Sequence, residues 1–594
     1  MTRFATDRLA LGLAVVGAVA GLASQTINIA LSQAVSESPR NAATAALYPW
    51  TVRLDLLVLL VLGLAVVLLA LWRPGSEGCP FPRAWLGVPA LSLGLVAAWR
   101  STRFDGLLLL LSGAAAVWLG FRLAGGADRR AWWPLGVAFL VRAAAALALA
   151  AYGQSALGQS VVLDDEASYD FAARQVARIL ATGSGDLDLE WRHLSGHHLD
   201  LLGFLYWARE PDFTSLRILD AGLGTLAVGL LLGIGRSLWP QPAAYAATWL
   251  TVLWPLNIVW SGTGLRESLS LVTVLLLLWL GVAQPWRGRS RGHLALTLVT
   301  AGLAALVLGG ARPESATALA LAACLVLLVP LLARVDRARL LALLGIAALA
   351  AAGALAGLLG QPLSPRAIEY RAAISQLTPL IEHERTKLPP KPSPDLMNMG
   401  TLLRAIPPGR EGPETVIISG YEQDPLAYRV LTADGTSFIV LPADARRLSD
   451  ENVQWQDVLG RLADGARLLF VPDFRSDALA ARRLALTPDT LGWDALFILS
   501  LIAAWRTRRD LTPGRALLYA YPWLIILGLV ATSTNLGTLA RHRSTLEPWL
   551  ALASAPILAM LGRRAQQWRR PGQTAAPEPV RPGHPLGRLG SSQG

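Results

Sequence analysis

The sequence predicts an all-α polytopic membrane protein that carries a small α+β domain outside the membrane. Of its 594 residues, 53 % are hydrophobic and only 16 % are charged. The apolar residues gather in runs of roughly 17–25, the length of a helix that crosses a bilayer. Arginines fall in alternate loops between these runs, the charge pattern of a chain threaded through a membrane. The net charge of +12 is therefore a topology signal and does not indicate nucleic-acid binding.

The apolar runs predict about fourteen membrane-spanning helices. The first run is too long for the core of a signal peptide and lacks a convincing cleavage site, so we expect it to be retained. The loops richest in arginine mark the cytoplasmic face and place both termini there. The expected spans are residues 9–31, 54–72, 84–99, 105–121, 131–152, 214–238, 243–260, 265–283, 293–310, 315–333, 340–360, 493–505, 515–533 and 546–562.

These spans divide the chain into five parts. We expect an N-terminal four-span part (1–130), a transmembrane core with an external acidic loop at 153–213 (131–360), an extracytoplasmic domain (361–492), C-terminal transmembrane helices (493–562) and a disordered cytoplasmic tail (563–594). Cys79 and Cys324 are too few for a disulfide framework or a cysteine-based zinc site.

The segment 361–492 is too polar for the bilayer and too long for a plain connection. Residues 428–432 and 436–441 flank Ala433-Asp-Gly435, which predicts a β-hairpin. We expect a helix at 366–387 and an amphipathic segment on the membrane surface at 458–484.

Three adjacent carboxylates, Asp164, Asp165 and Glu166, follow the predicted span 131–152 and open an amphipathic segment. Like charges this close raise the pKa of at least one carboxyl, so one could act as a base while a neighbour binds or orients a substrate. Helix capping accounts for the same residues, because Asp or Glu before a helix accepts hydrogen bonds from its first N–H groups. The sequence is compatible with both a catalytic role and a capping role.

Further charged residues lie on the outer side, where the charge pattern disfavours cations. Arg541-His542-Arg543 could bind a phosphate, and membrane snorkelling is the alternative. Arg266 and Glu267, and Arg312 and Glu314, could bind a substrate or form local ion pairs. Arg142 lies in mid-span, and we predict a structural pair with Asp220. The spacing of His193, His197 and His198 fits no metal motif, so no metal site is assigned.

Placed outside the membrane directly after a span, Asp165-Glu166-Ala-Ser-Tyr169 and the following Ala172-Ala-Arg-Gln-Val176 resemble the GT-C superfamily of integral-membrane glycosyltransferases. The likeness is closest to bacterial protein-mannosyltransferases and aminoarabinose transferases, and Asn535-Leu-Gly-Thr-x-x-Arg-His-Arg543 also resembles the end of several such envelope proteins. It covers residues from about 131 to 562, which makes the first four spans an N-terminal addition.

The resemblance implies an inverting glycosyltransferase on the outer face of a bacterial plasma (inner) membrane. It would move a sugar from a polyprenyl-phosphate donor to a glycan, lipid or protein acceptor, in contact with membrane lipids. Asp165 would be the general base, with Glu166 behind it as the second catalytic residue. For Asp164, helix capping is favoured over catalysis. The residues implied in substrate binding are Asp164, Tyr169, Arg266, Glu267, Arg312, Arg541, His542 and Arg543.

No cofactor is assigned. Some members of the superfamily bind a divalent cation, but no ligand set can be read from this sequence. Two alternatives remain: a polysaccharide polymerase or ligase that uses lipid-diphosphate glycans, and a lipid or glycan transporter. A transporter would require inverted repeats and polar residues along a path through the midplane.

Overall fold

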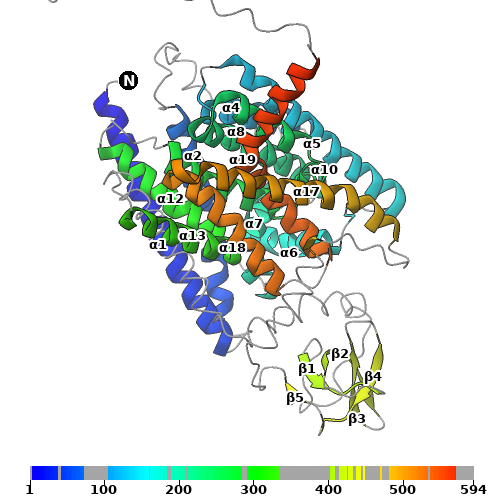
Figure 1. The fold of residues 1–594 in the computed structure, drawn as a ribbon. Helices are drawn as coiled ribbons and strands as arrows, with labels where there is room; N and C mark the ends of the chain where they lie inside the picture. Colours follow the sequence, from blue (N-terminus) through cyan, green and yellow to red (C-terminus); the bar gives the residue numbers. More distant parts are fainter. Residues whose placement is uncertain are drawn as a thin grey trace, which may run out of the picture.

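The structure is a computed structural model of a mostly helical protein with one small sheet (Figure 1). It describes residues 3–37, 42–71, 105–126, 128–158, 161–162, 164–183, 189–208, 212–283, 291–332, 402–408, 414–423, 426–432, 436–442, 444, 446–447, 469–470, 480–532 and 536–569. The predicted spans 84–99 and 340–360 and the predicted helix 366–387 lie outside these residues, as does most of the predicted surface segment 458–484.

Each predicted span within the described part of the chain overlaps a helix, although several helices extend beyond the predicted bounds. The helices are α1 (Arg3–Glu37), α2 (Ala42–Leu71), α4 (Asp105–Leu123), α5 (Trp132–Tyr152), α6 (Asp164–Thr182), α7 (Leu189–Ala208), α8 (Phe213–Leu238), α9 (Gln241–Leu253), α10 (Pro255–Trp260), α11 (Glu267–Ala283), α12 (Arg291–Ala311), α13 (Pro313–Leu332), α17 (Ala480–Thr507), α18 (Pro513–Thr532) and α19 (Leu536–Arg569). Short 3-10 turns lie at Arg129–Ala131 and Arg508–Asp510, and a π-turn lies at Gly153–Leu157.

Six helices of the described part are long and apolar enough to cross a membrane. Their apolar segments are Leu9–Ile27, Leu47–Leu71, Arg129–Ala156, Phe213–Leu238, Arg291–Ala311 and Arg541–Arg564. Two shorter apolar helices, Leu108–Leu123 and Glu267–Ala283, pack among them. The membrane class of the protein is thereby supported, whereas the total of about fourteen spans stays a prediction.

One expected span is divided in two. The sequence predicts a continuous helix over 243–260, but α9 ends at Leu253 and α10 begins at Pro255. Trp254, between them, is extended, with φ −70° and ψ 119°. Proline has no N–H to donate and its ring disfavours a helical residue before it, so the helix breaks at this point. The prediction of one continuous span here is wrong.

Helix α8 is the central element of the bundle, and most of its residues are buried. A Cβ on Gly229 would lie 2.3 Å from the Cα of Gly120, so the backbones of α8 and α4 touch, as small residues allow in membrane bundles. With 26 residues, α8 is about 39 Å long. Arg217 near its start and Arg236 near its end therefore mark opposite ends of the bundle.

A set of polar contacts closes the Arg236 end. The carboxylate of Asp128 accepts hydrogen bonds from Arg236 and Tyr245 at 2.8 Å each and from Gln241 at 2.6 Å. These bonds tie the start of the 3-10 turn before α5 to the end of α8 and the start of α9. Arg515 donates to the carbonyl of Leu238 at the same end.

The five-stranded antiparallel sheet has the order β4-β3-β2-β1-β5. Its strands are β1 (Leu402–Ala405), β2 (Glu414–Gln423), β3 (Leu426–Leu431), β4 (Ser437–Val440) and β5 (Arg446–Arg447). The predicted hairpin is confirmed, because β3 and β4 pair antiparallel with Leu431 opposite Ser437. The sequence missed β2, whose Val416 and Ile418 join the sheet core with Tyr428 and Val430.

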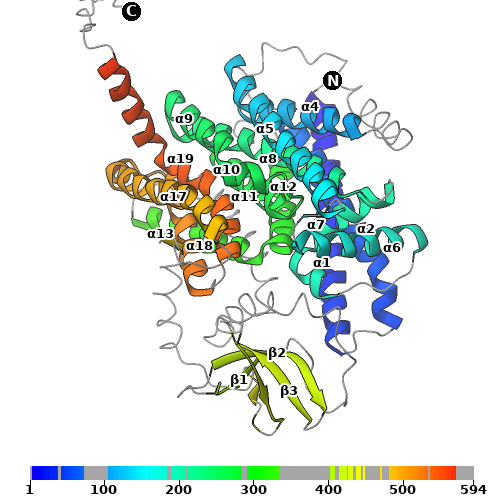
Figure 2. The ribbon, with the colours of Figure 1, turned by 90° about the vertical axis from the view of Figure 1, so that its right-hand side faces the viewer.

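Figures 1 and 2 show the sheet at one end of the helix bundle. The N-terminal end of α1 and the C-terminal end of α19 lie toward the opposite end. This arrangement agrees with the sheet on one side of a membrane and these two helix ends on the other, although which side is the cytoplasm stays a prediction.

Arg142 does not pair with Asp220, so that prediction is wrong. The guanidinium of Arg142 is fully buried and donates to the side-chain oxygen of Asn257 and to the carbonyl of Thr251. Glu547 of α19 is the carboxylate whose charge acts on it. Asp220 lies close to Glu267 and Ser268 instead, because α8 turns it toward α11.

Candidate functional site

The acidic stretch forms the first turn of α6, which begins at Asp164. Of the three carboxylates, Glu166 is the one whose side chain the structure describes. It is fully buried and its Oε2 accepts a hydrogen bond from Arg217 at 2.6 Å and another from the N–H of Val162 at 2.7 Å. Arg217 is also fully buried. Glu166 therefore ties α6 and the loop before it to the start of α8.

The inner face of α6 packs on α7. Tyr169 is buried and meets His198 of α7 edge to face, with ring centroids 5.4 Å apart. Ala172, Ala173 and Val176 continue this face at helical spacing. The predicted substrate residue Tyr169 thus has a packing role in this structure.

Four residues from distant parts of the chain meet at the start of α11. We call them the Glu267 cluster: Glu267 at the start of α11, Arg312 in the turn between α12 and α13, and Arg541 and His542 on α19. Arg312 donates to the carboxylate of Glu267, and Nε of Arg541 lies 3.4 Å from the same oxygen. Nη1 of Arg312 lies 3.2 Å from Nε2 of His542. The structure brings these four predicted site residues together.

The charges of the Glu267 cluster favour an anion. Two guanidiniums surround one carboxylate, and an imidazole stands beside them. Glu267 and Arg312 are almost completely buried, whereas the side chain of Arg541 is 19 % exposed. Arg541 also lies over the indole ring of Trp260, 5.3 Å from its centroid. Arg541 is therefore the cation of the cluster that is best placed to meet a ligand from outside.

The acidic turn of α6 and the Glu267 cluster are linked through α8. Arg217, the partner of Glu166, is three residues before Asp220 on α8, an axial rise of about 4.5 Å. Asp220 in turn lies near Glu267. One turn of α8 thus connects the two groups at the same end of the bundle.

The other predicted arginines hold helices together. Nη1 of Arg266 donates to the carbonyl of Ala311 at 3.0 Å, which satisfies a free carbonyl at the end of α12. Arg543 is buried and donates to the hydroxyl of Thr490 at 2.7 Å and to the carbonyl of Leu469, with Trp493 beside it. Positions 541 and 543 differ by about 200° around a helix, so they cannot face the same ligand. The helical period alone predicts this separation.

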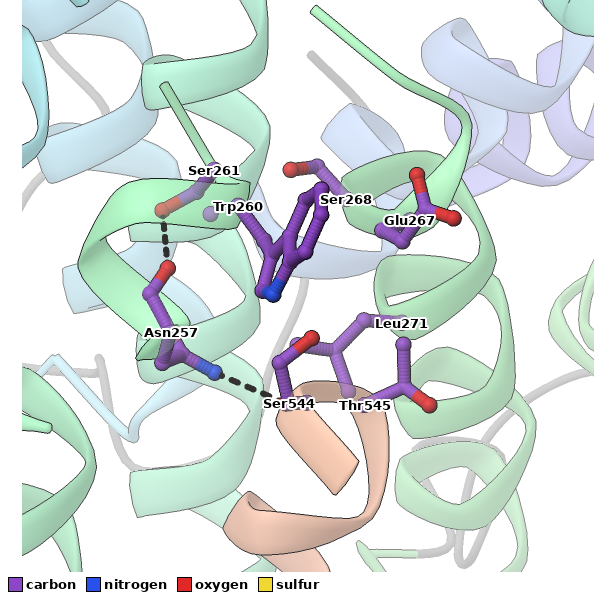
Figure 3. A pocket seen from close by; sticks show the side chains of 9 residues that line it. Asn257, Trp260, Ser261, Glu267, Ser268, Leu271, Ser544 and Thr545 are labelled. Carbon is purple, nitrogen blue, oxygen red and sulfur yellow. Dashed lines mark hydrogen bonds between the residues drawn. The ribbon is translucent and has the colours of Figure 1, made fainter. Parts of the chain in front are cut away.

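A small pocket adjoins the Glu267 cluster between α10, α11 and α19 (Figure 3). The indole of Trp260 stands at its centre, with Asn257 and Ser261 on one side and Glu267 and Ser268 on the other. Asn257 donates to the carbonyl of Ser544 at 3.2 Å. The pocket is lined by Gly224, Asn257, Trp260, Ser261, Glu267, Ser268, Leu271, Ser544 and Thr545.

His198 is a neutral structural histidine. Its Nε2 lies 3.2 Å from the carbonyl of Gly264, to which it donates when that nitrogen carries the proton. Burial, with a smaller contribution from the charge of Arg266, lowers the pKa of His198 to about 4. Within the part of the chain that the structure describes, no three His, Cys, Asp or Glu side chains are placed to hold a metal ion.

Sequence reasoning missed two residues of this end of the bundle. Arg217 lies near the outer end of a predicted span, where the charge pattern disfavours arginine. The pattern that indicates a role for Arg541 therefore also indicates one for Arg217. Trp260 carries no such signal, because interfacial tryptophans are common in membrane proteins. The side chains of Asp164, Asp165, His193 and Glu314 lie outside the described residues.

Comparisons with known proteins found no matching family model, no matching curated protein and no matching solved structure.

Proposed function

We propose that this protein is a membrane glycosyltransferase of GT-C type. It transfers a sugar from a polyprenyl-phosphate donor to a glycan, lipid or protein acceptor on the outer face of a bacterial plasma membrane. One observation carries the proposal: one turn of α8, from Arg217 to Asp220, links the acidic first turn of α6 to the cationic Glu267 cluster at one end of an apolar helix bundle. The reaction needs a base and a phosphate site next to each other at a membrane surface.

The Glu267 cluster supports the phosphate side of the proposal. Arginine offers planar paired donors that suit a phosphate, and hydrogen bonds to charged groups are the stronger ones. Arg541 makes the first contact because it is the most exposed of the four, and Arg312 and His542 lie directly behind it. Glu267 orients both guanidiniums and offsets part of their buried charge.

Asp165 is the general base of the proposed reaction. Glu166 is already paired with Arg217 in a buried site, where it cannot reach an acceptor without breaking the pair. Asp165 is the residue before Glu166 in the first turn of α6, and successive positions of a helix differ by about 100°. It takes the proton of the acceptor hydroxyl as that oxygen bonds to the anomeric carbon. The bond from that carbon to the phosphate breaks, polyprenyl phosphate leaves, and the configuration inverts.

A lipid or glycan transporter is the second candidate function. The broken helix at Trp254-Pro255 favours it, because transporters often bind their cargo at such breaks. Arg142 donates to the carbonyl of Thr251 in the last turn of α9, just before this break. Ionisable residues at membrane depth are costly and mark sites or pathways in many membrane proteins.

Reconstitution into liposomes separates the two candidates. Purified protein is incubated with radiolabelled polyprenyl-phosphate sugars and with an envelope extract as the acceptor. A transferase releases polyprenyl phosphate and labels the extract, and the Asp165→Asn protein does not. If labelled lipid moves between the leaflets and no sugar is released from any donor, the result would support the transporter function and contradict the transferase function.

A further inference from the structure

Two adjacent histidines on α7 contact the backbone shortly before each partner of the Arg312–Glu267 ion pair. His198 lies against the carbonyl of Gly264, three residues before Glu267. His197 packs against Gly310, two residues before Arg312, and a Cβ at position 310 would lie 2.5 Å from Nδ1 of His197. Helix α7 thus braces the start of α11 with one ring and the end of α12 with the other.

Helices α1 and α2 support the side chain of His197. Oδ1 of Asp55 on α2 lies 3.8 Å from Nε2 of His197 and accepts a hydrogen bond of 2.5 Å from the hydroxyl of Ser24 on α1. All three side chains are at least nine-tenths buried. The carboxylate lies between the hydroxyl and the imidazole, whereas a catalytic triad places the imidazole in the middle. The group is therefore an anchor and not a nucleophile.

Helix α2 also supports α6. Tyr48 and Val52 of α2 form a buried cluster with Val176 and Ile179 of α6. The same N-terminal helix thus touches α6, whose first turn holds Asp165, and through His197 it reaches α12, which ends just before Arg312. The first two helices are built into the candidate site, although the sequence suggests that they are an addition.

We propose that Asp55 and His197 are positioning residues of the Glu267 cluster. The buried Asp55 carboxylate fixes the His197 ring, the ring fixes the end of α12, and Arg312 is thereby held within reach of Glu267. A displacement of about 1 Å at a site of this kind costs a large part of its function. The positioning role stands on the contacts alone, and only its effect on donor binding rests on the proposed function.

The reactivity of single arginines toward phenylglyoxal tests the positioning role in the full-length protein in nanodiscs. Mass spectrometry follows the modification of Arg312 near the site and of Arg236 at the far end. Asp55→Asn should raise the rate at Arg312 about tenfold and leave Arg236 unchanged. The matched control is Asp128→Asn, which breaks the contacts at the far end and should show the reverse pattern.

Two further variants keep the test decisive if Asp55→Asn folds poorly. Gly310→Ala leaves both charges in place but fills the space between the imidazole and α12, and should also raise the Arg312 rate. Ser24→Ala removes one hydrogen bond to Asp55 and should raise it about threefold. Unchanged Arg312 reactivity in folded Gly310→Ala and Ser24→Ala proteins, or an equal rise at Arg312 and Arg236, would overturn the inference.

A second arm measures binding of sugar-free polyprenyl phosphate to the same proteins by native mass spectrometry. The positioning role predicts about tenfold weaker binding to Asp55→Asn and normal binding to Asp128→Asn. Wild-type protein that binds no polyprenyl phosphate would refute the proposed function, while the arginine rates would still decide the role of Asp55 and His197. Normal binding by an Asp55→Asn protein with a reactive Arg312 would overturn the link to the donor.

Discussion

Glu166 and Arg217 form a 2.6 Å ion pair in which neither side chain is exposed. The pair joins the first turn of α6 to α8 near its start, so it fixes the position of this turn against the bundle. A buried pair contributes little net stability, but loss of one partner leaves the other charge uncompensated. Glu166 is in this way a structural carboxylate next to a proposed catalytic one.

This pair predicts a stability defect in Glu166→Gln. The variant should lose about 3–5 kcal/mol of folding free energy, because the buried guanidinium of Arg217 keeps its charge without a partner. Thermal melting in detergent, followed by size-exclusion chromatography, measures the loss. The double variant Glu166→Leu/Arg217→Met should recover most of it, and a Glu166→Gln protein as stable as wild type would contradict the pair's importance.

Asp165→Asn should show the opposite behaviour. The protein should fold and melt normally, while transfer falls by about 10²–10⁴-fold, the usual contribution of general-base catalysis. Asp164→Asn is the matched control and should cost far less, because Asn caps a helix about as well as Asp. Full activity of Asp165→Asn in the liposome assay would remove this residue from the mechanism.

Substitution of the two arginines of α19 should affect different properties, donor binding for Arg541 and stability for Arg543. Arg541→Lys should weaken polyprenyl-phosphate binding by about 1.5–3 kcal/mol, because lysine keeps the charge but loses the paired donors. Arg543→Lys should bind normally and melt at a lower temperature, because Arg543 holds Thr490 and Leu469. Calorimetric titration and melting curves of both variants decide the assignment, and the reverse result would exchange the two roles.

The lowered pKa of His198 predicts that the protein loses stability in acid. Its folded pKa of about 4 lies below the ordinary value of 6.5, so between these two pH values the unfolded chain binds the proton and the folded protein does not. Stability should therefore fall as the pH drops from about 6.5 to 4 and stop falling from this cause below 4. Melting temperatures across this range should change less in His198→Gln than in wild type. Equal slopes would show that other groups cause the acid loss.

Cysteine labelling tests the orientation of the bundle. Ser437 lies on the sheet and Asp510 in an exposed turn near the Arg236 end. In a background without Cys79 and Cys324, Ser437→Cys should react with an impermeant maleimide in intact cells. Asp510→Cys should react only after permeabilisation. Labelling of both in intact cells would contradict the assigned topology.

Local sequence patterns are enough to predict the membrane class, the approximate positions of most described helices and the β3–β4 hairpin. These features depend on local composition and period, which a chain carries in its order of residues. The sequence also indicates that Glu267, Arg312, Arg541 and His542 share one end of the bundle, because charge alternation assigns loops to sides.

Which side chains meet at that end depends on the packing of the whole bundle. Glu166 finds Arg217, Arg142 finds Asn257, Asp55 finds His197, and Arg543 turns away from Arg541 toward Thr490. The physical reason is that these contacts depend on how each helix is rotated and how deeply it sits against its neighbours. Packing of side chains across the whole bundle sets that rotation and depth, and no single stretch of sequence contains it.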